Sequence, residues 1–315
     1  MKILLVRNDN IGDLICTTPA IEALKKKYPS YSIDIVVNSY NYSAIEQNPF
    51  INKIYCYTKP KHVTGFINKL IAGIKKLKII LKIRKEKYDV VIVLRRKYSK
   101  SAELFSKITN AKYKIGAKNI KGKDGFNIYV DIKEKQHEVE FCFDCLDFFG
   151  VKNNEEKTFF YINRELENKY LLFKDFYCFH VSARMENNQL SEDKISGILE
   201  KLDKNNIILT AEPKDYAMAD NLSKKFKIQF VKTSSFIDLG ALFKNLKFVI
   251  TLEGGAMHLA AAVGTKTIAL FGQSEISRWY PWGYENLVIQ DSSKVANNIK
   301  VEDILELLNK EHLNG

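Results

Sequence analysis

The sequence predicts an α/β protein built on parallel sheets, and three observations point to that class. Short apolar runs alternate with helical patterns along the chain, as strands and crossover helices do in a doubly wound sheet. The stretch 248–272 has the pattern of strand, tight turn, helix and strand, which is half of a parallel unit. The length of 315 residues is enough for two domains.

Four apolar runs in the first half are predicted to be strands of one sheet: residues 2–7, 33–37, 53–57 and 90–94. A polar loop follows the first run, and a helix is expected from Asp13 to about Lys27. Pro19 falls inside that helix, so we expect a kink or a late helix start. Ligands bind such sheets at the carboxyl ends of strands, which makes the loop 8–13 a candidate site.

The second half is predicted to form a second sheet after a polar linker. Residues 153–157 lack apolar periodicity, so we place the linker between there and about residue 171, with domains at 1–160 and 161–315. A helix is expected from about Ser191, and a final helix from Val301. Strands are expected at 176–181, 207–210, 228–231, 248–251 and 267–271.

The turn at 253–258 is a candidate ligand site. Gly254 and Gly255 stand at a strand-to-helix junction, where glycine lets a ligand approach the backbone. Free N–H groups in the first turn of a helix favour a phosphate. His258 could donate to a phosphate or sugar oxygen, and Glu253 could accept from sugar hydroxyls. The alternative is an ordinary βαβ crossover with a satisfied polar turn.

Composition limits the partners and the compartment. The 49 basic and 37 acidic residues give a formal charge of +12, which favours anionic partners, although genomic bias towards Lys would give the same excess. No nucleic-acid motif accompanies the charge, so no nucleic-acid partner is expected. No signal peptide or membrane-length apolar run is visible, and a cytoplasmic protein is expected. Cys142 and Cys145 are expected to be core thiols, because no second ligand pair for a metal is evident.

The segment 61–87 is basic and amphipathic, and one helix is expected there. Its apolar residues recur at helical spacing with lysines between them. We expect the apolar stripe to face the sheet, while the lysines are either a solvated face or a contact with anionic lipid. The Lys- and Gly-rich segment 112–124 is expected to be a mobile loop.

Two motifs at opposite ends of the chain resemble glycosyltransferase family 9, the bacterial ADP-heptose:lipopolysaccharide heptosyltransferases. The family's donor motif, D-T-G-x-x-H-L-A-A-A, has its counterpart here with Glu253 at the Asp position, Gly254 at the Thr position, and Gly255 and His258 matching. The opening VRNDNIGDLICTTPAI resembles the family's I-G-D segment followed by T-x-P-A-I. The resemblance implies a GT-B fold, in which two Rossmann-like domains with parallel sheets face each other across the sugar nucleotide. It also implies that the final helix, from Val301, could cross back onto the first domain, as in other GT-B folds.

The resemblance also implies roles for residues in both domains. Asp13 would be the general base, since a carboxylate can take the proton of an acceptor hydroxyl; the alternative is a helix cap. A family helix start like His137-Glu138-Val139-Glu140 leaves His137 as either a site residue or a cap. Acceptor contacts are expected from Asn10, Gly12, Arg95 and Arg96. Donor contacts are expected from Ser182, Arg184, Asn188, Glu212, Asp215, Glu253, Gly254, Gly255 and His258.

The function implied by the resemblance is inverting, metal-independent transfer of heptose from ADP-heptose to a lipopolysaccharide or lipooligosaccharide core sugar, without a cofactor. The acceptor would be lipid-linked, with transient contact at the anionic inner face of the inner membrane. The family's basic residue near Asn187 is missing, which leaves a UDP- or GDP-sugar donor as an alternative. A nicotinamide-dependent Rossmann oxidoreductase is disfavoured, because no G-x-G-x-x-G follows either first strand.

Overall fold

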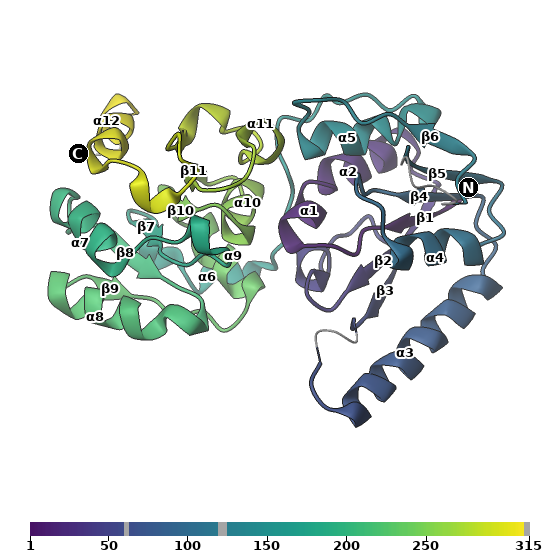
Figure 1. The fold of residues 1–315 in the computed structure, drawn as a ribbon, viewed down its shortest axis with the longest axis horizontal. Helices are drawn as coiled ribbons and strands as arrows, with labels where there is room; N and C mark the ends of the chain where they lie inside the picture. The colour runs from purple at the N-terminus through teal and green to yellow at the C-terminus, as the bar shows by residue number, and fades with distance from the viewer. Residues whose placement is uncertain (60–62, 119–124, 312–315) are drawn as a thin grey trace. The chain divides into compact units, whose positions relative to one another are not determined.

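The computed structural model describes residues 1–59, 63–118 and 125–311. The chain divides into two compact units, Met1–Glu155 and Glu156–Gly315 (Figure 1). The division falls between residues 155 and 156, inside the polar stretch that begins at Asn153. Each unit is built on a six-stranded sheet whose strand pairs are all parallel among the described residues.

The first sheet has the strand order β3-β2-β1-β4-β5-β6. Its strands are β1 (Lys2–Val6), β2 (Ser32–Asn38), β3 (Lys53–Tyr57), β4 (Val90–Val93), β5 (Tyr113–Ala117) and β6 (Ile128–Val130). The four strands predicted from apolar runs are confirmed. The expectation of a loop from residue 112 is wrong at its start: β5 pairs there with β4, and Ile115 is buried while Lys114 is half-buried. Residues 119–124 of that expected loop lie outside the described residues.

The helices of the first unit are α1 (Ile11–Ile15), α2 (Thr18–Lys27), α3 (Phe66–Lys85), α4 (Lys100–Ile108) and α5 (Glu138–Asp144). The expected break near Pro19 is confirmed, because α2 begins at Thr18 with Pro19 in its first turn, where a missing N–H costs nothing. On the face of the sheet that α3 and α4 partly cover, the core includes Leu4, Val36, Val91 and Phe105.

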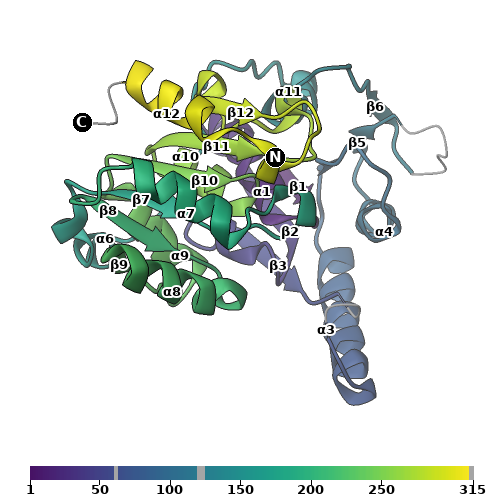
Figure 2. The same cartoon turned by 60° about the vertical axis from the view of Figure 1, so that its left-hand side comes forward.

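Helix α3 differs from the expectation that its apolar stripe faces the sheet. Ala72 and Ile83 are its buried residues, and the stripe itself is exposed. In two views the helix extends away from the sheet of its unit (Figures 1 and 2). Among the described residues, no helix combines the length and the apolar character that crossing a bilayer requires.

The second sheet has the order β12-β11-β10-β7-β8-β9. Its strands are β7 (Tyr177–His180), β8 (Ile207–Thr210), β9 (Gln229–Phe230), β10 (Phe248–Leu252), β11 (Lys266–Phe271) and β12 (Val288–Gln290). The strand–turn–helix–strand reading of 248–272 is confirmed as β10, α10 and β11, with Val249 in register with Thr267.

The helices of the second unit are α6 (Arg164–Asn168), α7 (Glu192–Lys201), α8 (Tyr216–Phe226), α9 (Phe236–Lys244), α10 (Gly255–Ala262), α11 (Ile276–Trp279) and α12 (Val301–Lys310). The final helix, α12, buries Ile304 and Leu308 in the core of this same unit, next to α7. Its apolar face is therefore occupied by the second unit.

Both sheets reverse their strand order at the centre. The chain starts at β1 or β7, adds two strands on one side, and then returns to add β4 or β10 on the other. Loops after two such neighbouring strands run apart, which leaves room for a ligand outside the carboxyl ends of the strands. The fold therefore places the candidate loops after β1 and β4 in the first unit, and after β7 and β10 in the second.

Candidate active site

Asp13 lies in the first turn of α1, directly after β1. Its side chain is 12% exposed, and Oδ1 accepts a hydrogen bond of 3.0 Å from Nη2 of Arg7. The N-cap of α1 is Asn10, and that helix end has no side-chain cap hydrogen bond. Asp13 therefore does not cap its helix, and its carboxylate is held by a buried cation with one edge open to solvent.

Arg7 is the centre of a charged cluster that we did not identify from the sequence. Its side chain is fully buried, and besides Asp13 it reaches Oε1 of Glu138 at 2.8 Å and Oδ1 of Asp9 at 3.0 Å. A further guanidinium N–H donates to the carbonyl oxygen of Leu94, at the end of β4. Burial works to lower the pKa of Arg7, but the three carboxylates raise it well above its ordinary value. Arg7 thus stays charged and joins β1, α1, β4 and α5.

Two further arginines complete the cluster, so that three cations face three carboxylates. Arg95 donates to Oδ1 of Asn8 at 2.8 Å and lies 3.7 Å from Asp9. Arg96 is buried: it donates to the carbonyl oxygens of Gln136 (2.7 Å) and His137 (3.0 Å), and its Nε lies 3.3 Å from Glu138. Arg96 therefore orders the start of α5, whereas Arg95 remains partly exposed.

Asp9 is the carboxylate that lies near both Arg7 (3.0 Å) and Arg95 (3.7 Å). Burial raises its pKa to about 7, against the opposing effect of Arg7, while the neighbouring Asp13 raises it further. A carboxyl group with a pKa in that range, next to the proposed base, is typical of a functional site. The other expected acceptor residues lie in the same loop: Asn10 is exposed and Gly12 is buried in α1.

The start of α5 shows the capping role expected as one reading of His137. Its Nδ1 accepts from the backbone N–H of Val139 at 3.1 Å, and its own N–H donates to Glu140 at 2.7 Å. This is a reciprocal capping box, so His137 is the N-cap. Cys142 and Cys145 are both fully buried, which confirms that they are core thiols.

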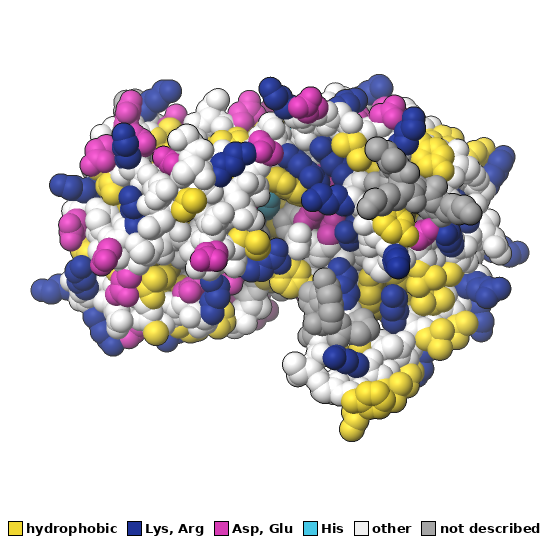
Figure 3. All heavy atoms as spheres, viewed as in Figure 1, with side chains coloured by type: hydrophobic (Ala, Val, Ile, Leu, Met, Phe, Trp, Pro, Cys, Tyr) yellow, Lys and Arg dark blue, Asp and Glu magenta, His cyan; other side chains and the backbone are white. Residues whose placement is uncertain are grey.

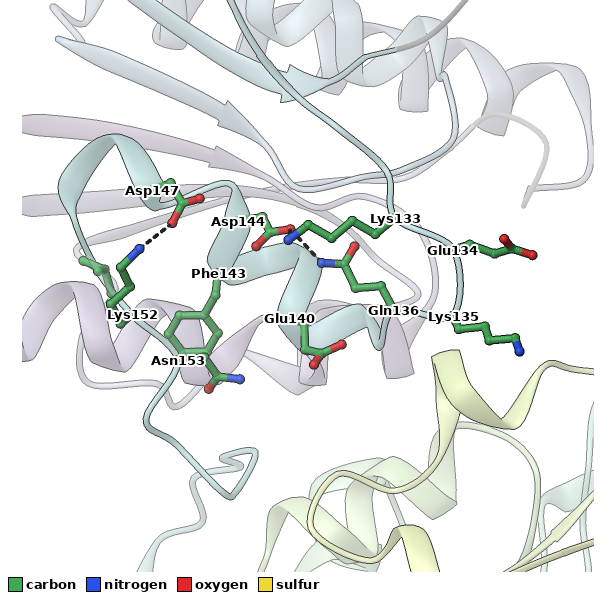
Figure 4. Close-up of a pocket in the computed structure, with 11 residues that line it drawn as sticks. Lys133, Glu134, Lys135, Gln136, Glu140, Phe143, Asp144, Asp147, Lys152 and Asn153 are labelled. Carbon is green, nitrogen blue, oxygen red and sulfur yellow. Dashed lines mark hydrogen bonds and ion pairs between the residues drawn. The ribbon is translucent and has the colours of Figure 1, made fainter.

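A cavity of about 500 Å³ lies beside α5, and two ion pairs lie among the side chains that line it (Figure 4). Asp144 accepts from Gln136 at 2.6 Å and lies 2.7 Å from Lys133, and Lys152 lies 3.5 Å from Asp147. None of the expected site residues lines this cavity. We therefore do not assign it to the active site.

In the second unit, Glu253 and Asn188 hold the loop that follows β11. Oε2 of Glu253 accepts from the backbone N–H groups of Gly272 and Ser274, both at 3.2 Å, and Oε1 accepts from the Ser274 hydroxyl. Oδ1 of Asn188 accepts from the N–H of Gln273 at 3.0 Å. Glu253 and Asn188, both expected to bind the sugar nucleotide, thus make hydrogen bonds within the protein and set the position of residues 272–274.

The N-terminus of α10 is the turn that the sequence marks as a candidate anion site. Its N-cap is Gly254, which makes no side-chain cap hydrogen bond. The Gly254 backbone is extended, a conformation that any residue can adopt. A Cβ at this position would meet nothing within 4 Å, so the space beside Gly254 is open. His258, in the first turn, is 6% exposed and lies edge-on to Trp279, with ring centroids 6.2 Å apart.

The remaining expected donor residues follow β7 and β8. Ser182 is buried, and its hydroxyl accepts from the backbone N–H of Glu212 at 2.8 Å. Arg184 and Glu212 are exposed, and Asp215 is half-buried. Lys214, which sequence reasoning missed, pairs with Asp215 at 3.2 Å and donates to the carbonyl oxygen of Ala183 at 2.7 Å. It places a second cation beside the loop of Arg184.

Comparison with solved structures identifies the fold. The structure of Escherichia coli heptosyltransferase WaaC with ADP matches with a TM-score of 0.83 at 16% identity, covering 98% of this chain and 99% of that one. A glycosyl transferase family 9 structure from Veillonella parvula matches with a TM-score of 0.81 at 18% identity, covering 100% and 97%. Two doubly wound parallel units with these counterparts define a GT-B protein.

The family follows from the sequence itself. Residues 76–308 match the model of glycosyltransferase family 9 (heptosyltransferase), so the chain belongs to that family and is a glycosyltransferase. Lipopolysaccharide heptosyltransferase 3 of Escherichia coli strain K12 is 28% identical over 305 residues, covering 88% of this chain and 84% of the relative. The family expected from the two motifs is therefore confirmed.

Proposed function

We propose that this protein transfers heptose, with inversion and without a metal ion, from ADP-heptose to the core of a lipopolysaccharide or lipooligosaccharide. The heptosyltransferase family match and the relatives of that name support the class of sugar and acceptor. Solved neighbours include WaaC with ADP and with an ADP-2-deoxy-2-fluoro heptose, which supports an adenine nucleotide donor.

The observation that carries the chemistry is the Asp13 carboxylate, held by Arg7 at the switch point of the first sheet. In the proposed reaction Asp13 removes the proton from the acceptor hydroxyl, whose oxygen attacks the anomeric carbon as the bond to ADP breaks. One displacement inverts the anomeric configuration. The hydrogen bond from Arg7 holds this carboxylate in place after β1.

The second unit is proposed to bind the nucleotide and to stabilise its departure. The free N–H groups at the start of α10, together with His258, would face the diphosphate. Arg184 would add a positive charge from the loop after β7, and Lys214 lies beside that loop. Glu212 and Asp215 follow β8 and are proposed to accept hydrogen bonds from the ribose hydroxyls. The N–H groups of α10, His258 and Arg184 would stabilise the negative charge on the departing diphosphate, as a divalent ion does in other transferases.

The acceptor is proposed to be lipid-linked, so the enzyme would work at the inner face of the inner membrane. The excess of basic residues, which gives +12, supports contact with anionic lipid. Arg95, partly exposed at the end of β4, is a candidate contact for an acceptor phosphate or carboxylate. Arg96 is buried, and we assign it a positioning role in place of direct contact.

The test is transfer from ADP-heptose to truncated lipooligosaccharide acceptors, followed by mass spectrometry. Asp13→Asn should lower turnover by about 10²–10⁴-fold, as loss of a general base does, while ADP affinity by calorimetry stays at the wild-type value. Asp34→Asn is the matched control, because Asp34 is also buried in the first unit but has different partners: it accepts from Asn52 and Tyr88 and lies 3.9 Å from Lys2. Wild-type turnover in Asp13→Asn would refute the base assignment.

The donor is tested separately by ligand-induced stabilisation. ADP should raise the melting temperature more than UDP, GDP or NAD at equal concentration, because stabilisation follows the ratio of ligand concentration to dissociation constant. A larger shift with UDP or GDP would keep the transfer chemistry and overturn ADP-heptose as the donor.

A further inference from the structure

Helix α3 exposes a continuous apolar face that no described residue of the first unit covers. The large apolar side chains of this face are between 43% and 82% exposed: Phe66, Ile67, Leu70, Ile71, Ile74, Leu77 and Leu81. These positions follow the three- and four-residue spacing of one side of a helix. In the space-filling view apolar side chains gather along the outer end of the region that α3 occupies (Figure 3). Isolated exposed apolar residues are common on proteins, but a row of seven on one helix is not.

A different and narrower face attaches α3 to its unit. Ala72 and Ile83 are buried, and Ile79 and Ile80 pack partly against the core near Tyr57 and Phe105. The exposed row is thus not a core face left loose, because the helix already has its core contacts. The row needs another partner.

The charge of α3 indicates what that partner is. Over Phe66–Lys85 the helix has six lysines and one arginine, and no acidic residue. Lys75, Lys78 and Lys82 are exposed and fall at helical spacing along one edge of the apolar row. Lys76 belongs to the attached face instead, since its Nζ lies 5.2 Å from the Tyr57 ring centroid and burial lowers its pKa.

An anionic bilayer fits this combination better than a protein does. Protein interfaces are depleted in lysine, whereas a helix with an apolar side and lysines at its edge is typical of attachment to an anionic lipid surface. A bilayer offers negative head groups and an apolar layer along the whole helix, which at 20 residues is about 30 Å long.

We propose that α3 is an interfacial helix: its row from Phe66 to Leu81 enters the outer part of an anionic bilayer, and Lys75, Lys78 and Lys82 contact the head groups. This inference deepens the proposed function, because it names the element that would bring the enzyme to a lipid-linked acceptor. It reverses the arrangement expected from the sequence, in which the lysines alone face the membrane.

The test uses the full chain and vesicles of equal parts phosphatidylglycerol and phosphatidylcholine, read by sedimentation. The apolar variant, Leu70→Gln with Ile74→Gln and Leu77→Gln, keeps good helix formers and should bind about tenfold or more weakly at both low and high salt. The lysine variant, Lys75→Gln with Lys78→Gln and Lys82→Gln, should bind about a hundredfold more weakly at low salt only. Leu171→Gln with Leu172→Gln removes comparably exposed leucines from the second unit and should bind as the wild type does.

Insertion itself is measured with a tryptophan at the apolar row. Leu77→Trp emission should be quenched by brominated lipids, and Leu172→Trp emission should be quenched no more than the native tryptophans. Three outcomes would each overturn the proposal. The apolar variant could sediment with vesicles as the wild type does, Leu77→Trp emission could be unquenched, or the wild type could be an oligomer while the apolar variant is a monomer. Transfer to a delipidated acceptor should be the same in the α3 variants as in the wild type. If the wild type itself transfers no heptose, the proposed function is refuted, but the proposal that α3 binds the bilayer is not.

Discussion

Replacing Arg7 by Met should destabilise the protein far more than removing any surface cation. Methionine fills a similar length of the site but leaves Asp9, Asp13 and Glu138 without their shared cation. The side chain of Arg7 is fully buried, that of Glu138 is 1% exposed, and those of Asp9 and Asp13 are 14% and 12% exposed. Water therefore cannot replace the lost charge at most of these oxygens.

The magnitude follows from that burial. Breaking a buried ion pair by removing one partner costs about 3–5 kcal/mol, because an uncompensated charge stays inside the protein. With about 4 kcal/mol and a urea slope of about 2 kcal/mol per molar, the unfolding midpoint should fall by about 2 M. Lys26→Met is the matched control: Lys26 pairs with Glu155 at 2.6 Å but is 55% exposed, so the loss should be under about 1 kcal/mol.

The assay is urea unfolding of both variants and the wild type, followed by circular dichroism. Equal midpoint shifts for Arg7→Met and Lys26→Met would refute the argument from burial.

Glu138→Gln tests whether Glu138 positions Arg7, and through it Asp13, because the variant keeps the shape of the side chain and leaves Arg7 in place. We expect kcat to fall about tenfold, which corresponds to about 1.5 kcal/mol of lost charged hydrogen bonding, with ADP affinity unchanged.

Two further predictions concern the second unit. Burial lowers the pKa of His180 to about 4, so between about pH 6.5 and pH 4 the unfolded state binds a proton that the folded state does not. The free energy of unfolding should therefore fall by about 3 kcal/mol as the pH falls through this range. His180→Asn, whose side chain can still bond Thr210, should remove this pH dependence in urea unfolding. A Cβ at Gly272 would overlap the carbonyl oxygen of Asn187, so Gly272→Ala should displace the loop and weaken ADP binding by about tenfold or more in calorimetry. Gly73→Ala is the control, because open space surrounds Gly73, and its ADP affinity should equal that of the wild type. Equal affinities of the two variants would show that the loop does not contribute to the donor site.

Sequence patterns were sufficient for the architecture and for the positions of the candidate loops. Apolar runs of four to six residues between helical segments predicted β1 to β4 and β7 to β11 closely, because strands buried on both faces are made of such runs. Strands β5, β6 and β12 were missed, since YKIGA, IYV and VIQ are short and partly exposed, and YKIGA is interrupted by lysine and glycine. Pairing with β4 makes β5 a strand, and pairing is a tertiary contact.

The sequence by itself determined the fold class, the family and the loops that carry Asp13 and His258, because these depend on local periodicity and short motifs. Only the tertiary structure decided which charges meet: Arg7 and Glu138 are 131 positions apart, and no local pattern links them. It also decided that Glu253 bonds the backbone of residues 272–274, and that α3 turns its apolar row outward. Periodicity shows that a helix has an apolar face, but what covers that face depends on the shape and position of every neighbouring element.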